Sequence, residues 1–279
     1  MKIYLPLLFL ILEAQALYAS PTSSQTLLSS PFHLAYQGAG IASFGENFSY
    51  LLNPAALGFH RRSKSALAYT RKQDKNQMLS FAITDLKSGF PLGFNYERYW
   101  SSQFTKEDLY KVHISSGVAI NPFLAFGVNI EREVFKKEKK WYGSLGALLR
   151  ISSKTGIGLT ANDLVFYNDS SLQNQRSKSL NLGFYQKFLK SFRARLDVSY
   201  QKGGATNLIQ DDYWMGKASI ESFLRKFIVV RLGSSFNFET KEDTYGAGLS
   251  FYGPKLQLDY QTEKRQSFYQ HALILKLLI

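Results

Sequence analysis

Charged side chains recur at every second position in several stretches of this sequence, and they are its first candidates for chemistry. Arg193, Arg195 and Asp197, for example, alternate with apolar residues. Successive side chains of a β-strand point to opposite faces, so residues spaced in this way would share one polar, inward face. The set expected on that face contains the basic residues Arg71, Lys111, Arg150, Lys187, Arg193, Arg195, Lys217, Arg231, Lys255 and Lys276 and the acidic residues Glu97, Glu131, Glu133, Asp197, Glu221 and Asp259.

Two interpretations of this polar face remain open. Basic side chains around an enclosed space attract an anionic headgroup such as a carboxylate. The candidates for such ligand contacts are Arg193, Arg195, Lys217 and Arg231. Alternatively, the charges form ion pairs in a packed interior, which we consider the better explanation for most of them.

Residues for nucleophilic or metal chemistry are sparse. His113 and Ser115 are the one His–Ser combination expected on a common inward face, and no third member of a triad is apparent. The sequence has no Cys and only four His, which are far apart and not spaced like metal ligands. We therefore expect no enzyme activity, no metal and no cofactor.

The composition narrows the class of protein. The 279 residues are 45% hydrophobic and 15% aromatic, which excludes a disordered chain, and the net charge is +13. The basic residues occur singly along alternating stretches or in loops rather than in an organised patch, so nucleic acid is not an expected partner. Contact with anionic outer-membrane lipid and lipopolysaccharide would explain the positive charge equally well.

The first 19 residues have the pattern of a secretory signal peptide. Lys2 is followed by the apolar stretch 3–12, and small residues allow cleavage after Ala16 or Ala19. The apolar stretch is too short to cross a membrane as a helix, which needs about 20 residues. A buried N-terminal strand or helix is the alternative.

Alternation of apolar and polar residues dominates the chain beyond residue 64. Leu124, Phe126, Val128 and Ile130 would share one face, for instance, and this period of two predicts strands rather than helices. About 14 strands are expected, with 12 to 16 as the range. They cover residues 65–72, 77–84, 91–100, 108–120, 123–134, 141–151, 155–164, 179–188, 191–201, 213–223, 227–238, 244–252, 255–262 and 268–279.

The connections and the aromatic residues predict where these strands lie. Short connections alternate with longer polar ones, and aromatic residues gather at both strand ends, as in outer-membrane barrels. Arg98 and Arg132 interrupt the apolar face near the long connections, where we expect them to meet lipid phosphates. A soluble exported sandwich would also alternate, but with its apolar face inward. We therefore predict an all-β fold, a transmembrane antiparallel β-barrel over residues 63–279 in the bacterial outer membrane.

Residues 20–62 do not alternate and carry a family resemblance. The stretches Tyr36–Ala42 (YQGAGIA), Asn47–Tyr50 (NFSY) and Asn53–Phe59 (NPAALGF) resemble the N-termini of FadL-like outer-membrane transporters and of the related PorV-type barrels. Ala56 departs from the family pattern, which usually has Gly there, and Glu46 stands alone where an acidic pair is common. The resemblance implies a hatch in the barrel lumen, formed by residues 20–62, whose hatch or gating residues would be Gly38, Gly40, Asn53, Pro54 and Ala55. A simple linker between signal and barrel is the alternative.

The resemblance also implies the function. A FadL-like barrel would mediate passive uptake of small hydrophobic, fatty-acid-like molecules. A PorV-like barrel would instead dock or shuttle exported proteins together with a secretion-system partner. A purely structural outer-membrane barrel is the third alternative.

Overall fold

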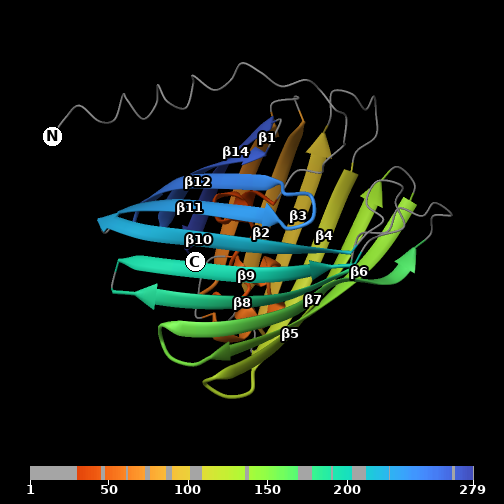
Figure 1. The fold of residues 1–279 in the computed structure, drawn as a ribbon, viewed down its shortest axis with the longest axis horizontal. Coiled ribbons are helices and arrows are strands. Elements are labelled where there is room, and N and C mark those ends of the chain that lie inside the picture. The colour runs from red at the N-terminus through yellow and green to blue at the C-terminus, as the bar shows by residue number, and fades with distance from the viewer. Residues whose placement is uncertain are drawn as a thin grey trace.

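A computed structural model describes residues 30–44, 48–60, 62–72, 76–85, 90–100, 109–135, 138–168, 178–189, 191–202, 212–225, 227–265 and 268–278. Within these residues, 14 strands form one closed barrel, and three short 3-10 helices precede them (Figure 1). The helices are η1 (Pro31–Tyr36), η2 (Ser49–Leu51) and η3 (Pro54–Phe59). The strands are β1 (Lys64–Lys72), β2 (Gln77–Asp85), β3 (Leu92–Trp100), β4 (Leu109–Ala119), β5 (Leu124–Phe135), β6 (Glu138–Arg150), β7 (Thr155–Asn168), β8 (Ser179–Phe188), β9 (Phe192–Gln201), β10 (Tyr213–Arg225), β11 (Ile228–Asn237), β12 (Asp243–Tyr252), β13 (Leu256–Arg265) and β14 (Phe268–Leu278).

Each strand pairs antiparallel with its neighbours in sequence, and β1 pairs with β14 to close the ring. At this closure Leu67 lies opposite Leu275. Closure leaves no sheet edge unpaired, which is the condition for a β-structure inside a hydrocarbon layer. The predicted all-β antiparallel barrel and its strand number are confirmed.

The apolar residues of the strands point outward. On β5, Phe126, Val128 and Ile130 are exposed, whereas Ala125 and Gly127 are buried. The same alternation continues on β8, where Leu182 is 54% exposed between buried Asn181 and Gly183. An apolar outer surface and a polar interior are typical of a β-barrel that is surrounded by lipid. No helix among the described residues is long and apolar enough to cross a membrane.

Two residues expected on the inner face lie elsewhere. Arg71 is exposed on the outer face of β1, between buried Thr70 and Lys72, because it shares its side of the strand with Leu67 and Tyr69. Lys255 is exposed in the turn between β12 and β13. Among the apolar residues, Leu148 on β6 is fully buried inside the barrel, whereas Phe251 on β12 is exposed outside.

The barrel has two distinct ends. We call the end where β1 begins and β14 ends the short-turn end; the connections 120–123, 151–154 and 253–255 lie there. The opposite end is called the long-loop end. Residues 30–44 and 48–60, here called the N-terminal segment, lie within the ring of strands, where η3 packs on β4 to β6 and η1 on β11 to β13 (Figure 1). The expected signal peptide, residues 1–19, lies outside the described residues.

Candidate functional site: the N-terminal segment and its cavity

Asn53 connects the N-terminal segment to the barrel wall. It is the N-cap of η3, where its Oδ1 accepts a hydrogen bond from the Ala55 amide at 3.0 Å. Asn at the N-cap followed by Pro54 at the first helical position is a strong local signal for a helix start. Nδ2 of the same side chain donates to the carbonyl oxygens of Ile41 at 2.8 Å and of Ala147 on β6 at 3.1 Å. One buried side chain therefore caps η3 and ties it both to the rest of the segment and to the wall.

A row of three glycines forms the seat on which η3 rests. Gly117, Gly127 and Gly146 lie opposite one another on β4, β5 and β6. A Cβ at any of these positions would lie closer than 3.0 Å to Asn53 or Pro54. Real Cβ atoms essentially never approach that closely, so any larger residue would push the segment off the wall.

Two further glycine pairs seat other parts of the segment. Gly158 on β7 and Gly183 on β8 face each other beneath Ile41 and Ala42. Gly233 on β11 and Gly246 on β12 likewise face each other beneath residues 34–36. The inner wall is thus flattened at three places, and at each place the backbone of the N-terminal segment takes the space of the missing side chains.

Asp197 on β9 holds the middle of the segment. Its carboxylate Oδ2 accepts hydrogen bonds from the amides of Gly40 at 2.6 Å and Ile41 at 3.0 Å. Gly40 has φ 135° and Gly38 has φ 69°, values at which a side chain is strained, so the glycines allow the chain to turn toward the carboxylate. A charged acceptor shared by two amides is stronger than a neutral one.

A buried ionic cluster lies beside η1. Glu221 on β10 contacts three guanidinium groups, those of Arg193 at 3.0 Å, Arg195 at 3.6 Å and Arg231 at 2.7 Å. Tyr36 of the N-terminal segment donates its hydroxyl proton to Glu221 at 2.7 Å. The guanidinium of Arg195 also lies 4.3 Å from the centre of the Tyr36 ring and donates to the Ser43 hydroxyl at 3.1 Å. The cluster therefore binds the segment as well as balancing its own charges.

The structure brings three of the four predicted ligand contacts together in this cluster. Arg193, Arg195 and Arg231 point into the lumen, as expected, but their partners are Glu221 and the N-terminal segment. The ion-paired interior is therefore the better description of these three residues. Lys217, the fourth, lines a cavity.

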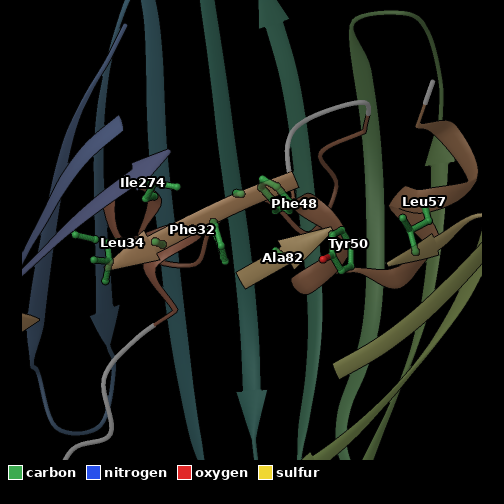
Figure 2. Packing of buried hydrophobic residues seen from close by; sticks show 10 residues of the cluster. Phe32, Leu34, Phe48, Tyr50, Leu57, Ala82 and Ile274 are labelled. Atoms are coloured by element: carbon green, nitrogen blue, oxygen red, sulfur yellow. The ribbon is translucent and has the colours of Figure 1, made fainter. Parts of the chain in front are cut away.

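Apolar side chains of the segment complete its contact with the wall. Phe32, Phe48 and Tyr50 form a chain of rings whose centroids are 4.8 and 6.1 Å apart. Ile274 of β14 and Ala82 of β2 pack against this group, as Figure 2 shows. A second cluster joins Ala42, Ala55, Ala56 and Phe59 to wall residues that include Leu148. The space between these parts of the segment and the wall is filled by packed side chains.

A cavity of about 530 Å³ lies on the side of the segment that faces the long-loop end. Its floor is formed by residues of the N-terminal segment, namely Ser30, His33, Gln37, Gly38, Leu51 and Leu52. Its walls come from the long-loop ends of several strands. They carry five acidic residues (Glu97, Glu131, Glu242, Asp243, Glu263) and three Lys or Arg residues (Lys111, Lys217, Arg265). The volume suits a small-molecule site, while the lining is mostly polar.

The predicted hatch residues divide between cavity and wall. Gly38 lines the cavity. Gly40, Asn53, Pro54 and Ala55 lie instead on the packed side of the segment, against Asp197 and the glycine row. The sequence reasoning did not anticipate the glycine rows. The signal for the first row was in the sequence: three successive strands, β4, β5 and β6, each have a glycine at an inward position.

Two histidines of the segment are held neutral by their surroundings. Burial, together with the positive charges of Lys276, Arg195 and Lys217, lowers the pKa of His33 from 6.5 to about 3. Burial and Lys64 lower the pKa of His60 from 6.5 to about 4. Burial raises the pKa of the Tyr50 hydroxyl far above its usual 10, and Glu97 contributes. The segment is therefore bound in an uncharged form at neutral pH.

The expected His–Ser pair does not form a dyad. Ser115 donates its hydroxyl proton to Asn129 at 2.9 Å, while Nδ1 of His113 faces Glu131 at 3.3 Å. Across the part of the chain that the structure describes, no three His, Asp or Glu side chains are grouped so as to hold a metal ion.

Comparison with solved structures identifies the architecture. The toluene transporter TbuX of Ralstonia pickettii matches with a TM-score of 0.67 and 13% identity, over 90% of this chain and 98% of that one. The CymD monoaromatic hydrocarbon channel matches with a TM-score of 0.63 and 11% identity, over 89% and 96% of the two chains. A FadL homologue of Pseudomonas aeruginosa matches with a TM-score of 0.62 and 10% identity, over 89% and 97%.

The chain has the FadL-like barrel fold. The resemblance noted in residues 36–59 is thereby supported at the level of the fold. No protein-family model and no curated protein matches the sequence.

Proposed function

We propose that the chain is an outer-membrane channel for the passive passage of small hydrophobic molecules, with its N-terminal segment as a hatch. One observation carries the proposal: the segment packs against the inner wall at three glycine seats and forms the floor of a cavity at the long-loop end. The transporters and channels that share the fold support a transport role, and the apolar outer wall supports a place in the outer membrane.

The substrate class follows from the same comparison. Two proteins of similar structure are a toluene transporter and a monoaromatic hydrocarbon channel. For this chain we propose molecules of that size, with an apolar body, and include fatty-acid-like amphiphiles. The cavity volume of about 530 Å³ is in the range of small-molecule sites.

Anionic outer-membrane lipid is the proposed surrounding. Arg98 lies 5.3 Å from the ring centre of Trp100, and Arg132 lies 5.4 Å from that of Trp141, near the long-loop end of the barrel. A guanidinium group stacked on an indole ring presents a planar, charged face that suits phosphate oxygens. We propose that these two pairs contact lipid or lipopolysaccharide phosphates.

A bulky residue in the glycine row tests the hatch. In Gly127→Val, the new side chain would clash with Pro54 and displace η3, so uptake of toluene into vesicles that contain the protein should rise. Val128→Leu, on the outer face of the same strand, is the matched control and should leave uptake unchanged. Proteolysis of the segment in each variant shows whether it has left the wall.

A second variant releases the segment without adding bulk. Asp197→Asn weakens the hydrogen bonds to Gly40 and Ile41 and should raise uptake in the same direction. If proteolysis shows a released segment in both variants and uptake stays at the level of the unaltered chain, the hatch role is wrong. A stoichiometric protein partner in mild detergent would redirect the assignment to docking of exported proteins.

A further inference from the structure

One wall of the cavity presents a buried carboxyl group that pairs with no cation among the described residues. Glu97 on β3 is 4% exposed and lines the cavity. It accepts hydrogen bonds from the side-chain amide of Asn95 at 3.1 Å and from the Tyr99 hydroxyl at 2.6 Å, both of which are neutral donors. Buried carboxylates are usually paired, so this one needs a positive partner.

The neighbouring lysine is turned to another carboxylate. Lys111 lies opposite Glu97 in the register of β3 and β4. Its ammonium group lies 3.5 Å from Glu133 and 5.3 Å from the centre of the Tyr99 ring. Lys111 therefore neutralises Glu133 and leaves Glu97 to the cavity.

Two unsatisfied acceptors lie beside Glu97. Asn95 is 1% exposed, and its Oδ1 finds no hydrogen-bond partner in the described part of the chain. His113 lies opposite Asn95 on β4, and its Nε2 is buried without a partner there too. Nδ1 of His113 faces the Glu131 carboxylate, so in the neutral ring Nδ1 is the donor and Nε2 is the acceptor.

These three groups match one chemical class. Glu97, Asn95 Oδ1 and His113 Nε2 all accept hydrogen bonds, and all three residues line the same cavity. A primary ammonium group offers three donors and one positive charge. An anionic headgroup would meet five acidic side chains against three Lys or Arg residues across the lining.

We propose that Asn95, Glu97 and His113 form a binding site for the ammonium group of a small amine. Its hydrocarbon part would lie against Leu51 and Leu52 on the floor of the cavity. This proposal rests on the proposed function, since it names a substrate class for the same cavity: amphiphiles whose polar end donates hydrogen bonds rather than carrying negative charge.

A series of ligands with one ring and different head groups tests the site. Binding of benzylamine, benzyl alcohol, toluene and benzoate to the full chain in one detergent is measured by calorimetry at neutral pH. Benzylamine should bind about tenfold or more tightly than benzoate, because a hydrogen bond to a charged group contributes that much. Benzyl alcohol should fall between the two.

Variants of the site separate recognition from folding. Glu97→Gln keeps the shape of the side chain and removes its charge, so benzylamine should bind about tenfold more weakly while toluene is unaffected. Asn95→Asp retains the acceptor, replaces the amide that donates to Glu97 with a second oxygen and adds a negative charge, so benzylamine should bind at least as tightly as to the unaltered chain. Unchanged toluene binding in Glu97→Gln shows that its loss of benzylamine binding does not come from a damaged barrel.

The outcomes distinguish this proposal from the transport proposal. Equal or tighter binding of benzoate, or no change in Glu97→Gln, overturns the amine site. Because binding is measured without transport, that result leaves the hatch assay with toluene intact. Conversely, selective amine binding together with unchanged uptake in the hatch variants would retain the site and refute passage through the barrel.

Discussion

Asn53 and Gly146 meet so closely that a single methyl group cannot be placed between them. A Cβ on Gly146 would lie closer than 3.0 Å to Oδ1 of Asn53, the same oxygen that caps η3. The residue that caps η3 is therefore also the residue that packs directly on the glycine of β6. This contact makes the N-terminal segment part of the packed interior, and it allows the segment to be tested one side chain at a time.

Asn53→Ala should loosen the segment without disturbing the strands. The change removes the cap, about 1 kcal/mol, and leaves the carbonyl oxygens of Ile41 and Ala147 without their donor, about 1 kcal/mol each. Hydrogen exchange of residues 48–60 should therefore accelerate while strand amides stay protected. Asn53→Asp keeps the cap acceptor but turns a carboxylate oxygen toward the carbonyl oxygens of Ile41 and Ala147, so it should also accelerate exchange and shows that the cap alone does not hold the segment. Equal exchange in Asn53→Ala and the unaltered chain would contradict this role.

Glu221→Gln should destabilise the barrel strongly. The change leaves three guanidinium groups, those of Arg193, Arg195 and Arg231, without their shared counter-charge inside the lumen. Breaking a buried ion pair from one side costs about 3–5 kcal/mol. Urea unfolding from bilayers measures the loss. Tyr36→Phe removes the hydrogen bond donated to the same carboxylate and the one accepted from Arg231, and each should cost only about 1 kcal/mol, so equal losses in the two variants would refute the central place of Glu221.

Acid should weaken the attachment of the segment through His33. The bound ring has a pKa of about 3 because of burial and nearby cations, whereas a released ring regains its ordinary value of 6.5. A lowered histidine pKa means that the stabilisation is complete above pH 6.5 and is lost as pH falls toward 3. By about pH 5 the loss should be about 2 kcal/mol.

Proteolysis of the segment at neutral and acid pH measures this effect. The segment should become more accessible as pH falls, and His33→Gln should flatten the pH dependence. His60, whose pKa is lowered to about 4, remains in that variant and accounts for a residual slope. An unaltered slope in His33→Gln would show that other groups control the response.

An arginine introduced on the outer wall should lower the stability of the barrel in bilayers, and by more when it lies closer to the middle of the membrane. Leu182 is exposed in the middle of β8, and Leu182→Arg should destabilise the barrel in bilayers by about 2–4 kcal/mol. Leu189 is exposed in the turn that follows β8, and Leu189→Arg should cost about 0–1 kcal/mol. Equal costs at the two positions would contradict a membrane around the wall.

The strands could be predicted because the lipid-facing side chains impose a strict period of two. β5 and β8 follow that pattern closely, and their bounds differ from the expected ones by no more than a residue at either end. β7 was expected to end at Leu164 but continues to Asn168. Asp163 adopts φ 58° in an irregular stretch of the pairing, and the strand resumes beyond it.

The site could be predicted only in part, because a sequence does not state which strands face each other across a lumen. Glu221 and Arg231 were both expected inside, yet their joint contact with Tyr36 depends on how η1 crosses the barrel. The cavity depends on it too, since Asn95 and Glu97 line open space only where the segment stops short of the wall. Asn95 has no charge or motif that would have attracted notice.

The pairing of β1 with β14 has a consequence for biogenesis. It places Leu67 opposite Leu275, so β14 must pair with a strand about 200 residues earlier in the chain. Such distant pairing is slow in folding. The N-terminal segment precedes β1 and lies inside the barrel. We therefore expect it to be in place before β1 pairs with β14. On this view the barrel is never assembled with an empty interior, because the N-terminal segment is already in place while the strands close.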